Sequence, residues 1–268
     1  MRTLVHLSDL HFGRLDEAIV PPLVERIKSV RPDLIAISGD LTQRARRGQF
    51  RQARVFLDQL PFPKIVVPGN HDVPLFNLAA RVLDPFGGYR RHIDANLEPS
   101  RIDDEMAVIG LNSARALIAG GRGRLNRQQV ELAVASLRPL PPSLIKVIVT
   151  HHPFDLPAGY HPEHLVGRAR MAMTQLAEVG ADLFLAGHLH VSHVSHTAER
   201  YSIAGHSALV VQAGTLSTRG RGELNTFNVL RIARPEMTVE RYSWEPGSHA
   251  FTQSFADTFR HSEQGWTA

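Results

Sequence analysis

The chain of 268 residues contains no cysteine, so disulfide bonds and thiolate metal sites are excluded. It also has no apolar run of about 18 residues, and we therefore expect no membrane-spanning helix. The N-terminus lacks the basic, apolar and small-residue zones of a secretory signal. These absences make a cytoplasmic location the default expectation.

Lysine is scarce as well, because only Lys28, Lys64 and Lys146 accompany the arginines among 30 basic residues. The planar guanidinium of arginine suits phosphate, although genome composition explains the preference for arginine equally well. Against 26 acidic residues the formal charge is +4, which is too small to indicate nucleic-acid binding. No apolar surface helix stands out, so neither a membrane nor a membrane lipid is an expected partner.

The hydrophobic content of 43% is enough for one sizeable core. Strand and helix patterns alternate along most of the chain, and strand patterns alone follow from about His193. The alternation predicts an α/β fold with a mostly parallel sheet and helices outside it. The strand-rich C-terminal third predicts a second sheet packed on the first. We expect one domain over residues 1–245 and a tail over residues 246–268, as a cover or loosely ordered.

Five of the expected strands end in polar clusters, each directly after four or more mainly apolar residues. The clusters are Asp9 and His11; Asp40; Asn70, His71 and Asp72; His151 and His152; and His188 and His190. The carboxyl ends of parallel strands lie along one edge of a sheet, and ligands bind in the crevice outside that edge. We therefore expect the five clusters to converge in space.

The clusters offer oxygen and nitrogen donors without sulfur, a set that suits manganese, iron, zinc, nickel or cobalt without singling one out. Residues i and i+2 of an extended segment point the same way. Asp9 and His11 can therefore share one target, and so can the histidines of the last cluster. The candidates are too many for one tetrahedral ion. They favour two ions that share a bridging carboxylate, which hold both sides of an in-line displacement at phosphorus.

Each motif also has a structural interpretation. A lone Asp-x-His is most often a cap or a surface pair, and Gly-His-x-His at a strand end is ambiguous. Gly-Asn-His-Asp after an apolar run is a stronger signal, because Gly69 permits a sharp turn. A purely structural account would need five coincidences. His6 and His206 are better explained as core histidines, and His193 and His196 as sheet residues.

In this order, the motifs resemble those of the calcineurin-like metallophosphoesterases. They read Asp9-Leu10-His11, Gly39-Asp40, Gly69-Asn70-His71-Asp72, His151 and Gly187-His188-Leu189-His190. The resemblance spans roughly residues 3–232, and SDLHFG, SGDLT, VPGNHD and HHP are similar to the bacterial class III cyclic-nucleotide phosphodiesterase branch. It implies a four-layer α/β/β/α sandwich of two packed mixed sheets, with a dinuclear metal site at the carboxyl-terminal edge of the strands.

The resemblance also implies a role for each ligand position. The residues carried over are Asp9, His11 and His190 for the first ion, Asn70, His151 and His188 for the second, and Asp40 as the bridge. The sequence His151-His152-Pro153 leaves the choice of histidine open. The ligand of the family usually lies two residues before the proline, which favours His151 over His152.

These residues lead to a mechanistic hypothesis, in which a metal-bridging hydroxide attacks the phosphorus of a small phosphoester. His71, as an imidazolium, would assist the leaving oxygen, and Asp72 would orient His71. Arg219 and Arg221 are candidates for phosphate or ribose contacts, although a solvated loop is the simpler interpretation. Homodimers are common in the related branch, but no feature of this chain requires one.

A phosphodiesterase is the preferred activity, with cyclic nucleotides as the leading substrates. The alternative is a phosphomonoesterase or a nucleotide pyrophosphatase of the same fold. A metal-binding scaffold without activity is disfavoured, because every ligand position is filled.

Overall fold

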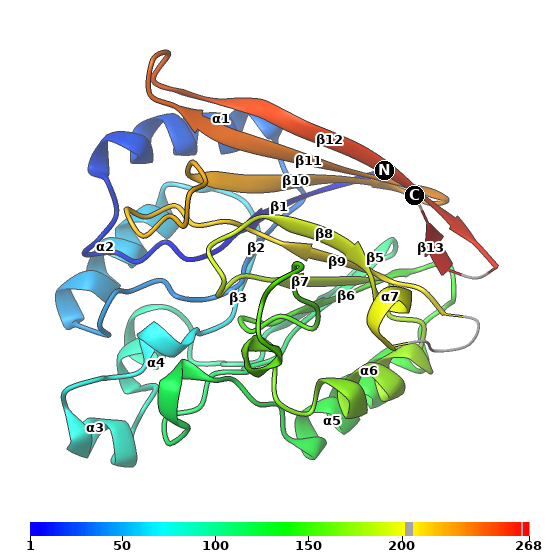
Figure 1. The fold of residues 1–268 in the computed structure, drawn as a ribbon, viewed down its shortest axis with the longest axis horizontal. Coiled ribbons are helices and arrows are strands. Elements are labelled where there is room, and N and C mark those ends of the chain that lie inside the picture. The colour runs from blue at the N-terminus through cyan, green and yellow to red at the C-terminus, as the bar shows by residue number, and fades with distance from the viewer. Residues whose placement is uncertain (202–205, 264, 268) are drawn as a thin grey trace.

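The computed structural model describes residues 1–201, 206–263 and 265–267. Its strands form a seven-stranded sheet of order β13-β12-β11-β10-β1-β2-β3 and a six-stranded sheet of order β4-β5-β6-β7-β9-β8 (Figure 1). The first sheet contains β1 (Arg2–Leu7), β2 (Leu34–Ile37), β3 (Lys64–Val66), β10 (Thr226–Ala233), β11 (Glu236–Glu245), β12 (Ala250–Ser262) and β13 (Gly265–Thr267). The second contains β4 (Ser100–Ile102), β5 (Met106–Gly110), β6 (Ile145–Val149), β7 (Leu183–Ala186), β8 (His193–His196) and β9 (Leu209–Gln212).

The helices lie outside these sheets. They are α1 (Val20–Val30), α2 (Arg47–Asp58), α3 (Leu78–Leu83), α4 (Gly87–His92), α5 (Arg127–Leu137), α6 (Ala169–Ala177) and α7 (Thr197–Tyr201). Four of them connect neighbouring parallel strands: α1, α2, α5 and α6. Short 3-10 turns cover Glu17–Ile19, Asn70–Asp72, Ala119–Gly121 and Pro162–His164.

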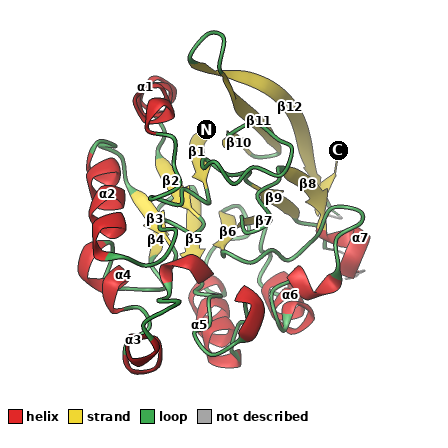
Figure 2. Ribbon diagram, turned by 60° about the vertical axis from the view of Figure 1, so that its left-hand side comes forward, coloured by secondary structure: helices red, strands yellow, loops and turns green. Residues whose placement is uncertain are grey.

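The fold is a four-layer α/β/β/α sandwich, as the resemblance implies. In Figure 2, α1 and α2 lie on one side, α5 and α6 lie on another, and the strands lie between them. Side chains alternate along each strand, so Ile35 and Ile37 of β2 face the first helical layer while Leu34 and Ala36 face the second sheet. Three apolar cores result, one beneath each helical layer and one between the sheets.

The prediction that the C-terminal third forms the second sheet holds for β8 and β9 and is wrong for β10 to β13. β10 pairs antiparallel with β1, so the last strands extend the sheet that the first strands begin. The second sheet is instead built from the middle of the chain, where β5, β6, β7 and β9 run parallel. β1 and β10 are far apart in the chain, so no local sequence pattern predicts that they pair.

Residues 250–262 form a strand, where the sequence predicts a cover or a loosely ordered tail. β12 pairs with β11 from Glu245 opposite Ala250 to Glu236 opposite Arg260. Most of its side chains are at least partly exposed, which explains the absence of a clear apolar pattern. β13 then returns along β12 and buries Trp266 completely.

The strand expected from His193 onwards ends at His196, where α7 begins. Ala198, Glu199 and Arg200 are good helix formers, which explains the change of structure. The rest of that expected strand, from residue 202, lies outside the described residues.

The expectation that no apolar surface helix stands out is wrong for α3. Leu78, Val82 and Leu83 are 69%, 62% and 82% exposed. The helix has only six residues, fewer than two turns, which is too short for periodicity to predict its faces. Within the described part of the chain, no helix combines the length and apolar character needed to cross a membrane.

Candidate metal centre

The five polar clusters follow β1, β2, β3, β6 and β7. The first three strands belong to one sheet and the last two to the other, so the clusters meet where the carboxyl ends of both sheets come together. The side chains gathered there include Asp9, His11, Asp40, His151 and His190, all buried. The predicted convergence is confirmed, although it joins two sheets rather than following one edge.

The backbone is strained at this meeting point. Nine described residues other than glycine have positive φ, and five of them are candidate ligands: Asp9 (54°), His11 (45°), Asp40 (52°), His188 (73°) and His190 (60°). A left-handed backbone costs such residues about 1–3 kcal/mol each and persists only where the surroundings enforce it. Its concentration here indicates a functional site.

Two glycines of the motifs are required by close approach. A Cβ atom at Gly69 would overlap the carboxylate of Asp40, and one at Gly187 would overlap the side chains of Ser8 and Asp9. Gly69 has an ordinary φ of −103°, so the sharp turn predicted from the sequence is not what requires glycine. The absence of a side chain lets neighbouring loops pack against the carboxylates.

The first group consists of Asp9, His11 and His190. Oδ1 of Asp9 lies 3.1 Å from Nε2 of His190 and 3.5 Å from Nε2 of His11. The two Nε2 atoms are 3.0 Å apart. Oδ1 of Asp9 is buried without a hydrogen-bond partner among the described residues. A cation between these atoms would satisfy that oxygen, and the group therefore fits a metal ion.

The second group consists of Asn70, His151 and His188. Oδ1 of Asn70 lies 3.0 Å from Nε2 of His151 and 3.2 Å from Nδ1 of His188. Oδ2 of Asp40 lies between the groups, 3.4 Å from Nε2 of His151 and 3.7 Å from Nε2 of His11. Its other oxygen accepts a hydrogen bond from the backbone of His71. This position suits a carboxylate that bridges two ions.

The expectation that His188 and His190 share one target is wrong. His188 faces Asn70, whereas His190 faces Asp9. The rule of alternating directions holds for extended backbone, but both histidines have positive φ. The two groups instead match the division that the resemblance implies.

The geometry distinguishes His151 from His152. Nδ1 of His151 donates to the carbonyl of Ser38 over 2.8 Å, which leaves its Nε2 free to face Asp40 and Asn70. His152 lies near enough to be considered, but its Nε2 faces the carbonyl of Gly121 and its Nδ1 faces the hydroxyl of Ser113. Both ring nitrogens of His152 are therefore committed to hydrogen bonds.

The electrostatics of the site follow from burial and close charge pairs. Burial opposes protonation of His151, but the Asp40 carboxylate beside it raises the pKa of His151 to about 9. Burial likewise opposes ionisation of Asp40, yet His151 outweighs it and holds the pKa of that carboxyl below its usual range. Burial lowers the pKa of His188 to about 3, and His151 adds to that effect. Because a metal ligand must be unprotonated, metal binding has to displace the proton of His151.

His71 and Asp72 do not form the expected pair. Asp72 accepts hydrogen bonds from the backbone of Gly69, Leu41 and Thr42, and from the Thr42 hydroxyl. It thereby joins the loops after β2 and β3. The ring of His71 is instead oriented by the carbonyl of Gln43, which lies 2.9 Å from Nδ1. Burial lowers the pKa of His71.

Two arginines flank the His71 ring. Nη1 of Arg219 lies 2.9 Å from Nε2 of His71 and 3.4 Å from Nε2 of His11, so Arg219 differs from the solvated loop residue that the sequence suggests. Nη1 of Arg44 lies 3.1 Å from Nδ1 of His71. Arg44 carries no signal in the sequence except that it follows the Asp40 motif by a few positions. Arg221 is exposed at the rim of the site.

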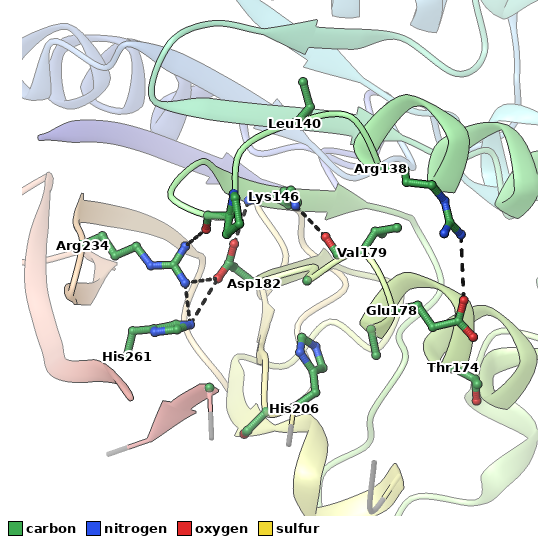
Figure 3. Close-up of a pocket in the computed structure, with 15 residues that line it drawn as sticks. Arg138, Leu140, Lys146, Thr174, Glu178, Val179, Asp182, His206, Arg234 and His261 are labelled. Atoms are coloured by element: carbon green, nitrogen blue, oxygen red, sulfur yellow. Dashed lines mark hydrogen bonds and ion pairs between the residues drawn. The ribbon is translucent and has the colours of Figure 1, made fainter. Parts of the chain in front are cut away.

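A cavity of about 280 Å³ opens over the two groups, lined among others by Asp40, Asn70, His188, His190 and Arg219. The largest cavity, about 600 Å³, lies elsewhere, at the amino ends of β6 and β7 (Figure 3). There the charges neutralise one another, as with Arg234 and Asp182 at 3.8 Å. The smaller cavity is the better candidate for chemistry, because its polar groups are not satisfied by one another.

A profile of the family described as calcineurin-like phosphoesterase matches residues 2–192 of this chain. The matched range includes all five clusters and ends before Arg219. The chain is also 34% identical over 80 residues to "Glycerophosphodiester phosphodiesterase GpdQ" from Enterobacter lignolyticus. That match covers 26% of this chain and only 29% of the enzyme.

Solved structures show the same fold at low sequence identity. A dimetal phosphatase from Danio rerio has a TM-score of 0.68 at 13% identity, over 97% of this chain and 99% of its own. Purple acid phosphatase PPD1 from yellow lupin has a TM-score of 0.68 at 11% identity, over 96% and 53%. Vacuolar Protein Sorting 29 from Cryptosporidium parvum has a TM-score of 0.52 at 12% identity, over 97% and 98%. Proteins with such different names share the fold, so these likenesses indicate architecture alone.

Proposed function

This chain belongs to the calcineurin-like phosphoesterase family, and on that premise we propose that it is a phosphodiesterase with two metal ions. The observation that supports this proposal most directly is the position of Asp40. Its Oδ2 lies 3.7 Å from His11 of one group and 3.4 Å from His151 of the other. One carboxylate oxygen thus faces both groups of nitrogen and oxygen donors.

In this proposal, each group would hold one divalent ion, and Asp40 would serve both groups. The ligands are Asp9, His11 and His190 on one side, and Asn70, His151 and His188 on the other. Their nitrogen and oxygen donors suit manganese, iron, zinc, nickel or cobalt. Such ions, when bound, supply Lewis acidity and lower the pKa of a bound water.

The side chains around the ions position the substrate and move the proton. Nη1 of Arg219 lies within hydrogen-bond distance of His71, so Arg219 is placed to bind an oxygen of the phosphoryl group. The carbonyl of Gln43 accepts from Nδ1 of His71, which leaves Nε2 as the atom that faces the cavity and exchanges a proton. His71 would deliver that proton to the leaving oxygen.

The choice of a diester rests on the shape of the site and on one relative. A second cavity lies beside the one over the metal groups, and Asn70, His71 and Gly120 line both. This leaves room for organic groups on both sides of a phosphorus atom. The relative with 34% identity is named as a phosphodiesterase. Cyclic nucleotides remain the leading substrates, and a phosphomonoesterase is the alternative.

A paired hydrolysis assay tests this proposal. Metal-stripped protein would be refilled with Mn²⁺ and given bis(p-nitrophenyl) phosphate or p-nitrophenyl phosphate at equal concentration. We expect strong preference for the diester, followed by activity on cyclic nucleotides. Preference for the monoester would make the protein a phosphatase instead.

Metal content separates an enzyme from a scaffold of the same fold. We expect close to two transition-metal ions per chain after refilling. A protein that binds no stoichiometric metal and hydrolyses neither ester would be a scaffold, and the proposed function would be wrong.

A further inference from the structure

The second cavity beside the candidate metal centre, here called the arginine cavity, has a volume of about 300 Å³. Arg44, Arg81 and Arg115 line it, together with Val73 and Leu75. The arginines come from three separate segments: the loop after β2, helix α3 and the loop after β5. None of the five polar clusters predicted this cavity.

Backbone carbonyls hold two of these guanidinium groups in place. Arg81 donates through Nε to Ala116 over 2.7 Å and through Nη1 to Pro74 over 3.0 Å. Arg115 donates through Nη1 to the carbonyls of Asn112 and Ala114. Each guanidinium is therefore fixed by neutral acceptors, which orient the group without cancelling its charge.

Arg44 completes the wall and connects it to the candidate active site. Its Nη1 donates to the carbonyl of Gln43 over 3.0 Å and lies 3.1 Å from Nδ1 of His71. The side chain is partly buried. An anion held by Arg44 would therefore lie next to the side chain that we expect to handle the proton.

Within the described structure, no direct ion pair neutralises the arginines of this cavity. No described carboxylate oxygen lies within 4 Å of a guanidinium nitrogen of Arg44, Arg81 or Arg115, and none lines the cavity. Glu98 is the carboxylate whose charge acts most on Arg115. It reaches that arginine through Gln129, which donates to Oε1 of Glu98 and accepts from Nη2 of Arg115. Grouping three partly buried cations without a directly paired anion is unfavourable, and a bound anion would relieve that cost.

The largest cavity shows what a compensated site looks like (Figure 3). Arg234 lies 3.8 Å from Asp182, and Arg138 lies 4.0 Å from Glu178. At this cavity, both arginines therefore have a carboxylate within 4.0 Å. The absence of carboxylates from the wall of the arginine cavity points to an external anion.

We propose that the arginine cavity binds a second phosphate group of the substrate, while the phosphoester to be hydrolysed lies over the two metal groups. The position of the hydrolysed phosphoester in this inference rests on the proposed function. The substrate class would be a phosphodiester with a further phosphate on its organic part. Planar guanidinium groups bind phosphate through paired hydrogen bonds, and both cavities share Asn70 and His71.

A binding experiment tests the arginine cavity without depending on hydrolysis. Thymidine 3′,5′-bisphosphate and thymidine 5′-monophosphate would be titrated into chelator-treated protein by calorimetry. We expect the bisphosphate to bind at least about tenfold more tightly. Arg44→Gln and Arg81→Gln should each reduce that ratio several-fold. Arg51→Gln, an exposed arginine of α2 outside the cavity, should preserve it.

The same comparison extends to the Mn²⁺-loaded enzyme. The substrates would be the p-nitrophenyl ester of thymidine 5′-monophosphate and the same ester with a 3′-phosphate. We expect the added phosphate to lower KM about tenfold, and both cavity variants to reduce the advantage. Thermal unfolding would check that Arg81→Gln is folded. If it is not, Arg44→Gln alone would test the cavity.

Each outcome separates this inference from the proposed function. Tight binding of the bisphosphate without hydrolysis of either ester would support the cavity and overturn the phosphodiesterase. Hydrolysis without any preference for the added phosphate would overturn the cavity alone. A preference that survives in both folded cavity variants would also overturn it, because the phosphate would then bind elsewhere.

Discussion

A buried carboxylate at the amino ends of the strands has different partners from a buried carboxylate at the carboxyl ends. Asp182, at the amino end of β7, accepts hydrogen bonds from the backbone of Lys146 and from Nε1 of Trp266, both over 2.9 Å. Asp40, at the carboxyl end of β2, commits one oxygen to His71 and directs the other at His11 and His151. Both aspartates are at most 3% exposed. Burial is therefore the same, and only the partners differ.

The comparison shows why the largest cavity is not the candidate active site. At the amino end, both oxygens of Asp182 accept hydrogen bonds from groups of the protein, and this arrangement stabilises the fold. At the carboxyl end, Asp9 has a buried oxygen without a partner in the described structure, and the backbone is strained at Asp40 and Asp9. Unsatisfied donors and acceptors, rather than volume, indicate where a ligand binds.

We expect the largest loss of metal binding and of kcat from Asp40→Ala. We expect both ions to be lost or weakened, since this carboxylate faces both groups, and kcat to fall by more than the roughly 10²- to 10⁴-fold attributed to one general acid. Metal analysis and diester hydrolysis would measure this. Asp58→Ala, on the surface of α2, is the control. Retention of two tightly bound ions in Asp40→Ala would contradict the bridging role.

His71→Ala should lower kcat by about 10²- to 10⁴-fold while two ions stay bound, because the ring nitrogens of His71 face Gln43 and Arg219. The metal content of the purified variant and its kcat would be compared with those of His161→Ala, whose side chain is 73% exposed. Loss of an ion from His71→Ala would show that His71 is a ligand and not a proton donor.

His151 and His152 are adjacent after β6, so the effects of replacing each can be compared directly. His151→Ala should lose the ion of the second group. His152→Ala should keep both ions but lower the free energy of unfolding by about 1–3 kcal/mol, because the Gly121 carbonyl and the Ser113 hydroxyl lose a buried partner. Metal analysis and denaturant unfolding distinguish the two effects. An ion missing from His152→Ala would reverse our choice of ligand.

Asp182→Asn tests the role of the amino ends of the strands. The amide nitrogen that replaces Oδ2 would face the backbone N–H of Lys146, so we expect the free energy of unfolding to fall by about 1–2 kcal/mol. Diester hydrolysis by the folded variant should not change. Asp104→Asn, whose side chain is 87% exposed, serves as the control. A large loss of kcat with unchanged stability would show that the amino end takes part in the reaction.

The smallest expected effect is the release of protons when metal binds. The pKa of His151 is raised to about 9 in the metal-free protein, so the ring is protonated at pH 7.5 and must lose that proton to become a ligand. Calorimetric titration with Mn²⁺ in buffers of different ionisation enthalpy would count about one proton or more. The release from His151 should vanish well above pH 9. Release that does not change with pH would contradict this assignment.

Much of the candidate site could be predicted from the sequence, because its information is local. Apolar runs that end in Asp9, Asp40, Asn70, His151 and His188 show both the strand and the chemistry at its end. The alternation of strand and helix segments then predicted an α/β fold. The inferences that failed applied the geometry of an extended strand beyond its end. One of them was the shared target expected for His188 and His190.

The tertiary structure decided how these pieces combine. Pairing of β1 with β10 assigned the C-terminal strands to the first sheet. Positive φ at His188 and His190 separated their targets, and the loop after β2 placed Gln43 where Asp72 was expected. Arg44, Arg81 and Arg115 line one cavity only because two loops and one helix pack side by side. The sequence by itself determined which groups stand at strand ends, since that depends on neighbours in the chain. Their partners depend on contacts between distant segments, which only packing settles.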